Sequence, residues 1–336
     1  MKKFKILSLD GGGVRGYLTT IILLNIEKVL NRDKKEYLPL GKYFDLIAGT
    51  STGAIIAGLL AIGKSAKEIK KIYEENIKEI FSNKMKNFNI NIKGIPIYGR
   101  AKYKKDNLEK MAKKYFGDKT FSKKDLVTNL LISTVDITTA KPRFYKSDYF
   151  SRNVGRKDEK LKDAIVASAS APAFFPVAKE LEYSSYLVDG GVSVNNPSLV
   201  ALIDGLEICK QNRIENKNIV LLSIGTGEMC EMPYNVEKLE DTQIGWISEN
   251  KAIIEILMTS QSKLAEFQTK FLCNTLEIKY KRINPKLGQK IALDEYKKID
   301  ILKNLGDIYK EDEKWILENL NVKNNSQNYN YYLQIF

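Results

Sequence analysis

Gly49-Thr50-Ser51-Thr52-Gly53 stands between two apolar segments of different character. Residues 43–48 before it are typical of a short buried strand, and residues 54–61 after it are typical of a buried helix. A serine with a glycine two positions away on each side, at a strand-to-helix turn, is the pattern of a nucleophile elbow, which holds the hydroxyl at the sheet edge over the helix N-terminus. A plain turn in which Ser51 or Thr50 only caps the helix fits the same five residues.

The residues before the elbow form another strand–loop–helix unit. Residues 4–9 are apolar enough for a central strand, residues 10–16 form a glycine-rich loop, and residues 19–30 are typical of a helix. Two such units in succession are typical of a parallel sheet covered by helices. We therefore predict an α/β fold.

Later segments extend this pattern without a break in composition, which predicts a single domain over residues 1–322. Residues 82–105 are rich in asparagine and contain Gly94, Pro96 and Gly99, which predicts a mobile excursion or lid, and residues 323–336 read as a loose tail. Further strands are expected at 129–135, 144–145, 186–188, 219–224 and 276–281, and helices at 65–81 (with a core-facing apolar stripe), 108–116, 161–170, 197–206, 248–271, 294–305 and 309–320.

The composition indicates a protein with a sizeable core. The chain has 336 residues, of which 43% are hydrophobic. No stretch reaches the roughly 20 apolar residues of a membrane span, and the apolar run at residues 6–9 is too short for a signal peptide. We expect a cytoplasmic protein.

The sequence contains no histidine. Cys209, Cys230 and Cys273 are far apart, so they are expected to be reduced thiols, and neither a metal site nor a cofactor is predicted. A Ser-His-Asp triad is excluded as well. If Ser51 is a nucleophile, a group other than imidazole must accept its proton.

The charge is strongly basic, with a formal net value of +13. Such an excess favours an anionic partner, either nucleic acid or an acidic membrane surface, although solubility alone also accounts for surface lysines. Lysines are dense between Lys64 and Lys124, but they lack the interleaved arginine and aromatic residues of RNA-binding proteins. No nucleic acid polymer is expected as a partner.

The loop Asp10-Gly11-Gly12-Gly13-Val14-Arg15-Gly16 allows more than one interpretation. A dinucleotide-binding turn has this glycine spacing, but the Asp10 carboxylate would repel a pyrophosphate, and the lysine of a phosphate-binding P-loop is missing. The alternative is an oxyanion hole, in which Gly11, Gly12 and Gly13 present backbone N–H groups at a helix N-terminus and Arg15 adds positive charge. Because adjacent parallel strands bring their turns to one edge of the sheet, this loop is expected beside the elbow.

Asp189 follows a strand-like segment and precedes Gly190 and Gly191. A free aspartate, with a pKa of about 3.9, is a poor base, but burial raises that value. Asp189 is therefore the candidate to accept the Ser51 proton. An aspartate that only bonds its own turn fits this tripeptide as well.

Together, these three blocks resemble the signature of the patatin-like phospholipases. Asp10–Gly16, Gly49–Gly53 and Asp189–Gly191 occur in the family's order, and residues 167–176 resemble its small-residue helix and the proline-aromatic turn after it. The resemblance implies a three-layer α/β/α sandwich with a mainly parallel sheet. It also implies lipid acyl hydrolysis by a Ser51–Asp189 dyad, with Gly11, Gly12, Gly13 and Arg15 in the oxyanion block. Gly16, Gly49, Gly53, Gly190 and Gly191 are then the motif glycines that shape the turns.

The resemblance implies membrane phospholipids as substrate, and the lysine excess favours peripheral binding at the acidic inner membrane. Phe174, Phe175 and apolar residues at 95–98 are candidates to line an acyl channel, and positions in the ordinary core fit them equally well. Compact bacterial members resemble antiviral effectors activated by a cyclic nucleotide, so such an activator is one expectation; homo-oligomerisation stays open. A housekeeping carboxylesterase or lysophospholipase, a nucleotide-binding module and an inactive scaffold are the alternatives.

Overall fold

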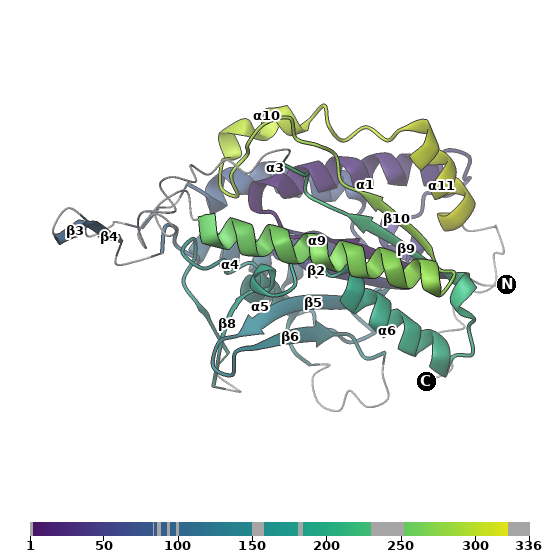
Figure 1. The fold of residues 1–336 in the computed structure, drawn as a ribbon, viewed down its shortest axis with the longest axis horizontal. Helices are drawn as coiled ribbons and strands as arrows, with labels where there is room; N and C mark the ends of the chain where they lie inside the picture. Colours follow the sequence, from purple (N-terminus) through teal and green to yellow (C-terminus); the bar gives the residue numbers. More distant parts are fainter. Residues whose placement is uncertain are drawn as a thin grey trace.

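The computed structural model describes residues 3–82, 84–85, 89–92, 95–98, 101–149, 158–180, 184–229 and 252–321. Its centre is an eight-stranded sheet in the order β10-β9-β1-β2-β5-β8-β7, with β6 beside β5 (Figure 1). The strands are β1 (Phe4–Leu9), β2 (Leu46–Thr50), β5 (Asn129–Asp136), β6 (Lys141–Lys146), β7 (Ala178–Glu180), β8 (Ser185–Asp189), β9 (Ile219–Ile224) and β10 (Lys279–Ile283).

Helices cover both faces of this sheet (Figure 1). One face carries α1 (Gly16–Asn31), α2 (Thr52–Ala61), α3 (Ala66–Ile80), α4 (Asp106–Phe116) and α5 (Leu161–Ser168), and the other carries α6 (Ser198–Gln211) and α9 (Ala252–Thr275). The alternation of side chains along each strand explains this arrangement. In β1, Leu7 and Leu9 enter the larger apolar cluster, whereas Phe4 and Ile6 enter the smaller one. The predicted three-layer sandwich is confirmed.

The sheet is parallel on one side and antiparallel on the other. β10, β9, β1, β2 and β5 are parallel, whereas β6 and β8 are both antiparallel to β5. β5 pairs with β2 through Ser133 opposite Thr50, and with β8 through Thr134 opposite Asp189. Two consecutive residues of β5 therefore set the distance between the elbow and Asp189.

The predicted elements are largely confirmed, with shifted ends. Residues 40–43 form a 3-10 helix, so β2 begins at Leu46. Ser65 caps α3 in a capping box with Glu68, and the apolar stripe of this helix is buried. In place of one helix at 294–305, the chain forms a 3-10 turn and the short α10 (Ile299–Leu302), followed by α11 (Lys310–Leu320). β7 was not predicted, because its Ala178-Lys179-Glu180 sequence carries no apolar alternation.

Several expectations fall partly or wholly outside the described residues. Within the predicted lid at 82–105, the structure describes an antiparallel hairpin of β3 (Asn89–Ile92) and β4 (Ile95–Tyr98), but not residues 83, 86–88, 93–94 and 99–100. The predicted tail at 323–336 lies outside the described residues, and so does Cys230. Cys209 and Cys273 are free and buried, and burial raises the pKa of both thiols to about 12.

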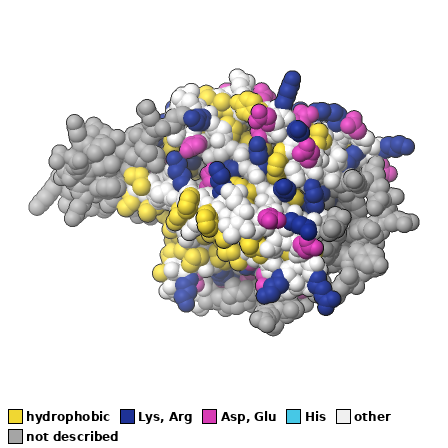
Figure 2. All heavy atoms as spheres, turned by 45° about the vertical axis from the view of Figure 1, so that its right-hand side comes forward, with side chains coloured by type: hydrophobic (Ala, Val, Ile, Leu, Met, Phe, Trp, Pro, Cys, Tyr) yellow, Lys and Arg dark blue, Asp and Glu magenta, His cyan; other side chains and the backbone are white. Residues whose placement is uncertain are grey.

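The surface combines charged and apolar regions. In the face shown in Figure 2, basic and acidic side chains are intermixed, and apolar side chains gather toward the left of the view. No helix in the described ranges has both the length and the apolar character needed to cross a bilayer. α9 nevertheless exposes large apolar side chains at Ile253, Leu257, Leu264, Phe267 and Phe271.

Candidate active site

Ser51 occupies a sharp turn between β2 and α2. Its φ of 55° and ψ of −120° lie in a region that residues with a side chain rarely adopt, as expected for a strained elbow. The glycines allow this turn, because a Cβ on Gly53 would lie 2.3 Å from the Leu9 carbonyl oxygen, and one on Gly49 would lie 2.3 Å from that of Gly53. The predicted strand–turn–helix around Ser51 is present.

Asp189, the last residue of β8, lies directly against this serine. The Ser51 hydroxyl donates a hydrogen bond to Asp189 Oδ2 at 2.5 Å, and the Gly191 N–H donates to Asp189 Oδ1 at 2.7 Å. Ser51 is 7% exposed and Asp189 is 2% exposed. Burial is the main influence on Asp189 and raises its pKa to about 7, although both hydrogen bonds oppose the rise. The carboxylate is thus a base of useful strength near neutral pH.

Gly190 explains how β8 approaches β5 so closely at this point. A Cβ on Gly190 would lie 2.4 Å from the Ser133 carbonyl oxygen of β5. Any larger residue would therefore push Asp189 away from the strand that positions it.

The glycine loop lies beside the same serine. A Cβ on Gly11 would lie 3.3 Å from Ser51 Cβ, and Gly13 lines the cavity that contains Ser51. The Gly11 N–H donates to the Asn195 carbonyl at 3.0 Å, and the Val14 N–H donates to the Leu293 carbonyl at 2.8 Å. Within the described residues, no acceptor takes the N–H of Gly12 or Gly13. Both amides therefore remain available as hydrogen-bond donors, and Gly13 lines the cavity.

Gly13 has a conformation that few other residues would tolerate. Its φ is +57°, and a Cβ there would lie 2.1 Å from the Leu293 carbonyl oxygen. Arg15 lies in the following 3-10 helix, Gly13–Arg15 (η1), and is not among the residues that line the cavity. Gly16 begins α1, where a Cβ would lie 2.2 Å from Thr52 Oγ1.

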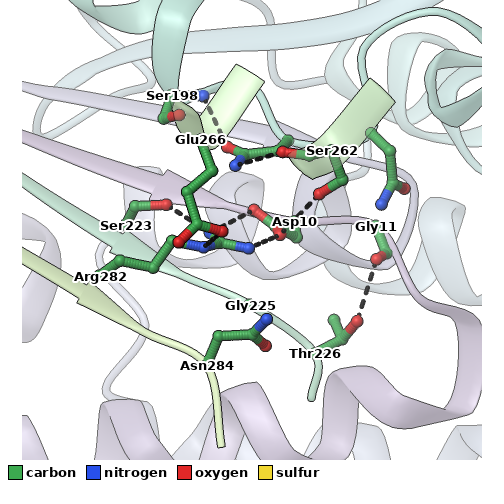
Figure 3. Close-up of polar contacts among 12 residues, drawn as sticks. Asp10, Gly11, Ser198, Ser223, Gly225, Thr226, Ser262, Glu266, Arg282 and Asn284 are labelled. Atoms are coloured by element: carbon green, nitrogen blue, oxygen red, sulfur yellow. Dashed lines mark hydrogen bonds and ion pairs between the residues drawn. The ribbon is translucent and has the colours of Figure 1, made fainter. Parts of the chain in front are cut away.

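Asp10 does not point into the site as a free charge, which corrects the sequence-based argument that it would repel a pyrophosphate. Its carboxylate is buried and accepts hydrogen bonds from Arg282 of β10, with Nη2 at 2.6 Å from Oδ2 and Nη1 at 3.2 Å from Oδ1 (Figure 3). Arg282 also donates to Ser223 at 2.7 Å and to Glu266 at 2.9 Å. Burial raises the pKa of Asp10, which the Arg282 charge opposes.

This ion pair fixes the start of the glycine loop to the neighbouring strands. It connects the end of β1 to β10 across the intervening β9, and the Asp10 N–H donates to the Ile224 carbonyl of β9 at 3.1 Å. Thr226 donates to the Gly11 carbonyl at 3.1 Å on the same side (Figure 3). Arg282 lies far from the motifs in sequence, so no local pattern indicates its role.

Three further polar residues complete the site and were not predicted. The Ser51 N–H donates to Ser168 Oγ at 2.9 Å, and Gln261 of α9 contacts the Asn195 N–H at 3.0 Å and the Gly191 carbonyl at 2.5 Å. The Tyr73 hydroxyl contacts Thr52 Oγ1 at 2.6 Å and also donates to the Gly13 carbonyl. Tyr73 therefore links the elbow to the glycine loop. Its spacing in the apolar stripe indicated only a core position.

A largely apolar cavity of about 750 Å³ opens at the dyad. Phe174 and Phe175, two of the predicted lining residues, line it and also belong to the larger apolar cluster, whereas the side chains at 95–98 lie outside the described residues. Apart from Ser51 and Asp189, few polar groups line the cavity. Its other walls come from α2, α3, α4 and the start of α9, and they include Ile55, Leu59, Ile72, Ile77, Leu108, Met111 and Met258.

Comparisons with known proteins agree with this geometry. A family model described as patatin-like phospholipase matches residues 7–202. A cGAMP-activated phospholipase from Escherichia coli is 35% identical over 228 residues, covering 67% of this chain and 62% of that protein. One of the same name from Vibrio cholerae is 35% identical over 237 residues, covering 66% and 64%. Patatin-like protein 4 from Arabidopsis thaliana is 30% identical over 335 residues, covering 90% and 82%. The matches thus span less than two thirds of both bacterial proteins.

Proposed function

Because this chain belongs to the patatin-like phospholipase family, we propose that it hydrolyses the fatty-acyl esters of phospholipids, with Ser51 as nucleophile and Asp189 as base. The single observation that supports this most strongly is the 2.5 Å contact between the two side chains at the mouth of an apolar cavity. The cavity suits a fatty-acyl chain, because most of its lining is apolar and both Ser51 and Asp189 contribute to it.

The reaction proceeds in two acyl-transfer steps. Ser51 Oγ bonds to the ester carbonyl carbon while its proton passes to Asp189 Oδ2; the tetrahedral intermediate then expels the alcohol, which takes that proton. A water molecule next gives a proton to Asp189 and attacks the acyl-enzyme, and Ser51 leaves with the proton as the fatty acid is released. The pKa of about 7 at Asp189 suits both directions of proton transfer.

The oxyanion hole in this proposal consists of the Gly12 and Gly13 N–H groups. Gly11 belonged to the predicted set, but its N–H is bonded to the Asn195 carbonyl, so its part is to let the loop pass close to Ser51. The N-terminus of α2 and the 3-10 helix η1 add favourable dipoles near the developing negative charge. Arg15 does not line the cavity and contributes only a positive charge near the loop.

Membrane contact and regulation belong to the same proposal. The exposed apolar side chains of α9 and the net charge of +13 support peripheral binding to an acidic bilayer. Two similar bacterial proteins are named for activation by cGAMP and a third for activation by cUMP-AMP, which supports a cyclic nucleotide as activator and a defence role as effector. A housekeeping lysophospholipase is the competing function, and it would need no activator.

The direct test is mass spectrometry of mixed phospholipid vesicles digested with the wild-type protein and with Ser51→Ala. We expect release of free fatty acids by the wild type and a loss of about 10⁴-fold or more in the variant, by analogy with other serine hydrolases. Thr139→Ala, which removes an exposed hydroxyl in the turn between β5 and β6, is the matched control and should digest at the wild-type rate. Equal digestion by Ser51→Ala would reject the nucleophile.

A further inference from the structure

A second hollow, of about 1290 Å³, lies beside the acyl cavity and has a different character. It is lined by five lysines and two carboxylates, together with aromatic rings. The cationic set is Lys84, Lys102, Lys290, Lys297 and Lys298; Asp294 and Glu295 are the acids, and Phe81, Tyr103 and Tyr296 are the rings.

Both acids in this basic hollow already have partners. Asp294 accepts from Lys102 and from the Tyr103 hydroxyl at 2.8 Å, and Glu295 accepts from Lys298 at 2.9 Å. In the described part of the chain, no carboxylate lies within ion-pair distance of Lys84 or Lys297. The hollow therefore holds excess positive charge and attracts an anion.

A thin aromatic wall separates the basic hollow from the acyl cavity. Phe81 lines both, and its ring centroid lies 5.6 Å from Tyr103 and 5.8 Å from Phe175. Tyr103 faces the basic side and Phe175 faces the acyl side, with their centroids 5.9 Å apart. The Tyr103 N–H donates to the Phe174 carbonyl at 2.8 Å, so the two linings are also joined through the backbone.

The segment Ala292-Leu293-Asp294 connects the basic hollow to the catalytic loop. Ala292 and Asp294 line the hollow, whereas the residue between them, Leu293, lines the acyl cavity. The Leu293 carbonyl accepts the Val14 N–H at 2.8 Å and touches Gly13. A displacement of this segment would therefore shift the glycine loop that lies beside Ser51.

We propose that the basic hollow binds a phosphate-bearing anion and that its occupancy sets the position of the Gly12–Gly13 amides through Leu293. Without the anion, the clustered lysines repel one another and favour displacement of residues 290–298 from the wall. A bound phosphate neutralises them, holds this segment in place and raises the rate of hydrolysis. The partly buried ring of Tyr296 provides a surface on which a base can stack. The activity readout rests on the function proposed above; the binding itself does not.

The test compares Lys84→Ala/Lys297→Ala with Lys35→Ala/Lys67→Ala, a control pair of exposed lysines that lowers the net charge equally. Binding of cGAMP, cUMP-AMP, ATP and inorganic phosphate is measured by isothermal titration calorimetry. Hydrolysis of a soluble short-chain ester is measured with each compound, and separately with vesicles of neutral or anionic phospholipid. We expect one of these phosphates to bind the wild type and raise its rate at least tenfold. The first pair should weaken binding at least tenfold and remove the response, whereas the control pair keeps both.

The outcomes distinguish a dissolved phosphate from a lipid head group, and they test the anion site separately from the proposed hydrolysis. Activation by a dissolved compound identifies a free nucleotide or phosphate, and activation by anionic vesicles alone identifies a lipid head group. If no phosphate source binds or activates, or if both lysine pairs lose the response equally, the basic hollow is not the site. Binding to the Ser51→Ala variant is measured as well. Intact binding in a protein whose wild type hydrolyses no ester would reject the proposed function and leave the anion site standing.

Discussion

At the scale of single residues, the site depends on one aspartate that is kept out of water. An exposed aspartate would be almost entirely ionised at neutral pH and weakly basic. Burial raises the pKa of Asp189 to about 7, while the Ser51 hydroxyl and the Gly191 N–H favour its charged form. In the proposed reaction of this histidine-free chain, a carboxylate with a pKa in this range takes the role that an imidazole has elsewhere.

The pH profile of hydrolysis tests this assignment. Below pH 7, Asp189 is protonated and cannot accept the Ser51 proton, so kcat/KM for a soluble ester should fall about tenfold per pH unit and level off above pH 7–8. With no histidine in the chain, no imidazole can produce this limb. Asp189→Asn should remove the limb together with most of the activity, and Asp33→Asn, at an exposed position, should keep both. A flat wild-type profile between pH 5 and 8 would contradict the base assignment.

The raised pKa of Asp189 also affects stability: activity should rise with pH, whereas the contribution of this residue to the free energy of unfolding should fall. Because the folded-state pKa is raised above the unfolded value, the folded protein binds this proton more tightly. The contribution of Asp189 to the free energy of unfolding is fully present below about pH 4 and is lost as the pH rises through 7. Urea denaturation of Asp189→Asn should therefore show a gain in stability relative to the wild type that grows from pH 5 to pH 8.

At the scale of secondary-structure elements, β10 is tied to the glycine loop by a buried ion pair. Arg282 of β10 reaches past β9 to Asp10, and both side chains are less than a tenth exposed. Removing one partner of such a pair leaves an uncompensated charge in the interior, which costs far more than an exposed pair is worth.

We predict that Arg282→Leu lowers the free energy of unfolding by about 3–5 kcal/mol, as measured by urea denaturation at pH 7. The comparison is Arg32→Leu, which removes the solvent-exposed Arg32–Glu313 pair and should lower the free energy of unfolding far less than Arg282→Leu does. If Arg282→Leu is too unstable to purify, Asp10→Leu/Arg282→Leu removes both charges and should recover part of the loss. Equal effects of Arg282→Leu and Arg32→Leu would show that the pair does not anchor the loop.

The arrangement of the elements explains which residues of the site could be predicted from the sequence and which could not. The proximity of Ser51 and the glycine loop could be predicted, because both lie at turns that follow adjacent parallel strands. The proximity of Asp189 to Ser51 was expected only from the resemblance of the three motifs, because β8 runs antiparallel to β5. Tyr73, Gln261 and Arg282 could not be predicted, because their partners are distant in sequence and each has an ordinary local role in a helix or strand. The direction of β8 was also hidden, since a five-residue strand carries no sign of which neighbour it will pair with.

At the scale of the whole molecule, the acyl cavity is a gap in the main core. Ile55, Ile72, Leu108, Met111 and Phe175 belong to the larger apolar cluster and also line the cavity. An unfilled apolar space lacks the dispersion contacts of a packed interior, so it lowers stability. The fold therefore gives up part of its stability to keep room for a substrate.

A fatty acid that fills this space should stabilise the protein. Palmitate, used below its micellar concentration, is expected to raise the Tm in differential scanning calorimetry by about 4 °C or more. This value assumes a palmitate concentration of about 100 times its Kd, at which binding raises the free energy of unfolding by about 2.7 kcal/mol. Butyrate has the same charge but too short a chain to fill the cavity, so it should leave the Tm within 1 °C. Equal shifts with both acids would indicate surface binding of the carboxylate and contradict an acyl chamber.

Because β2 and β8 both pair with β5, the proposed hydrolysis requires the correct register of these strands. Ser133 and Thr134, neighbours in β5, lie opposite Thr50 and Asp189. One peptide unit of β5 therefore separates the partner of the residue before Ser51, the proposed nucleophile, from the partner of Asp189, the proposed base. Sliding β8 by one residue would turn the carboxylate to the opposite face, and sliding it by two would carry it about 7 Å along the sheet. Compact but mispaired molecules would be catalytically silent, and ester turnover would count only the molecules that are correctly assembled.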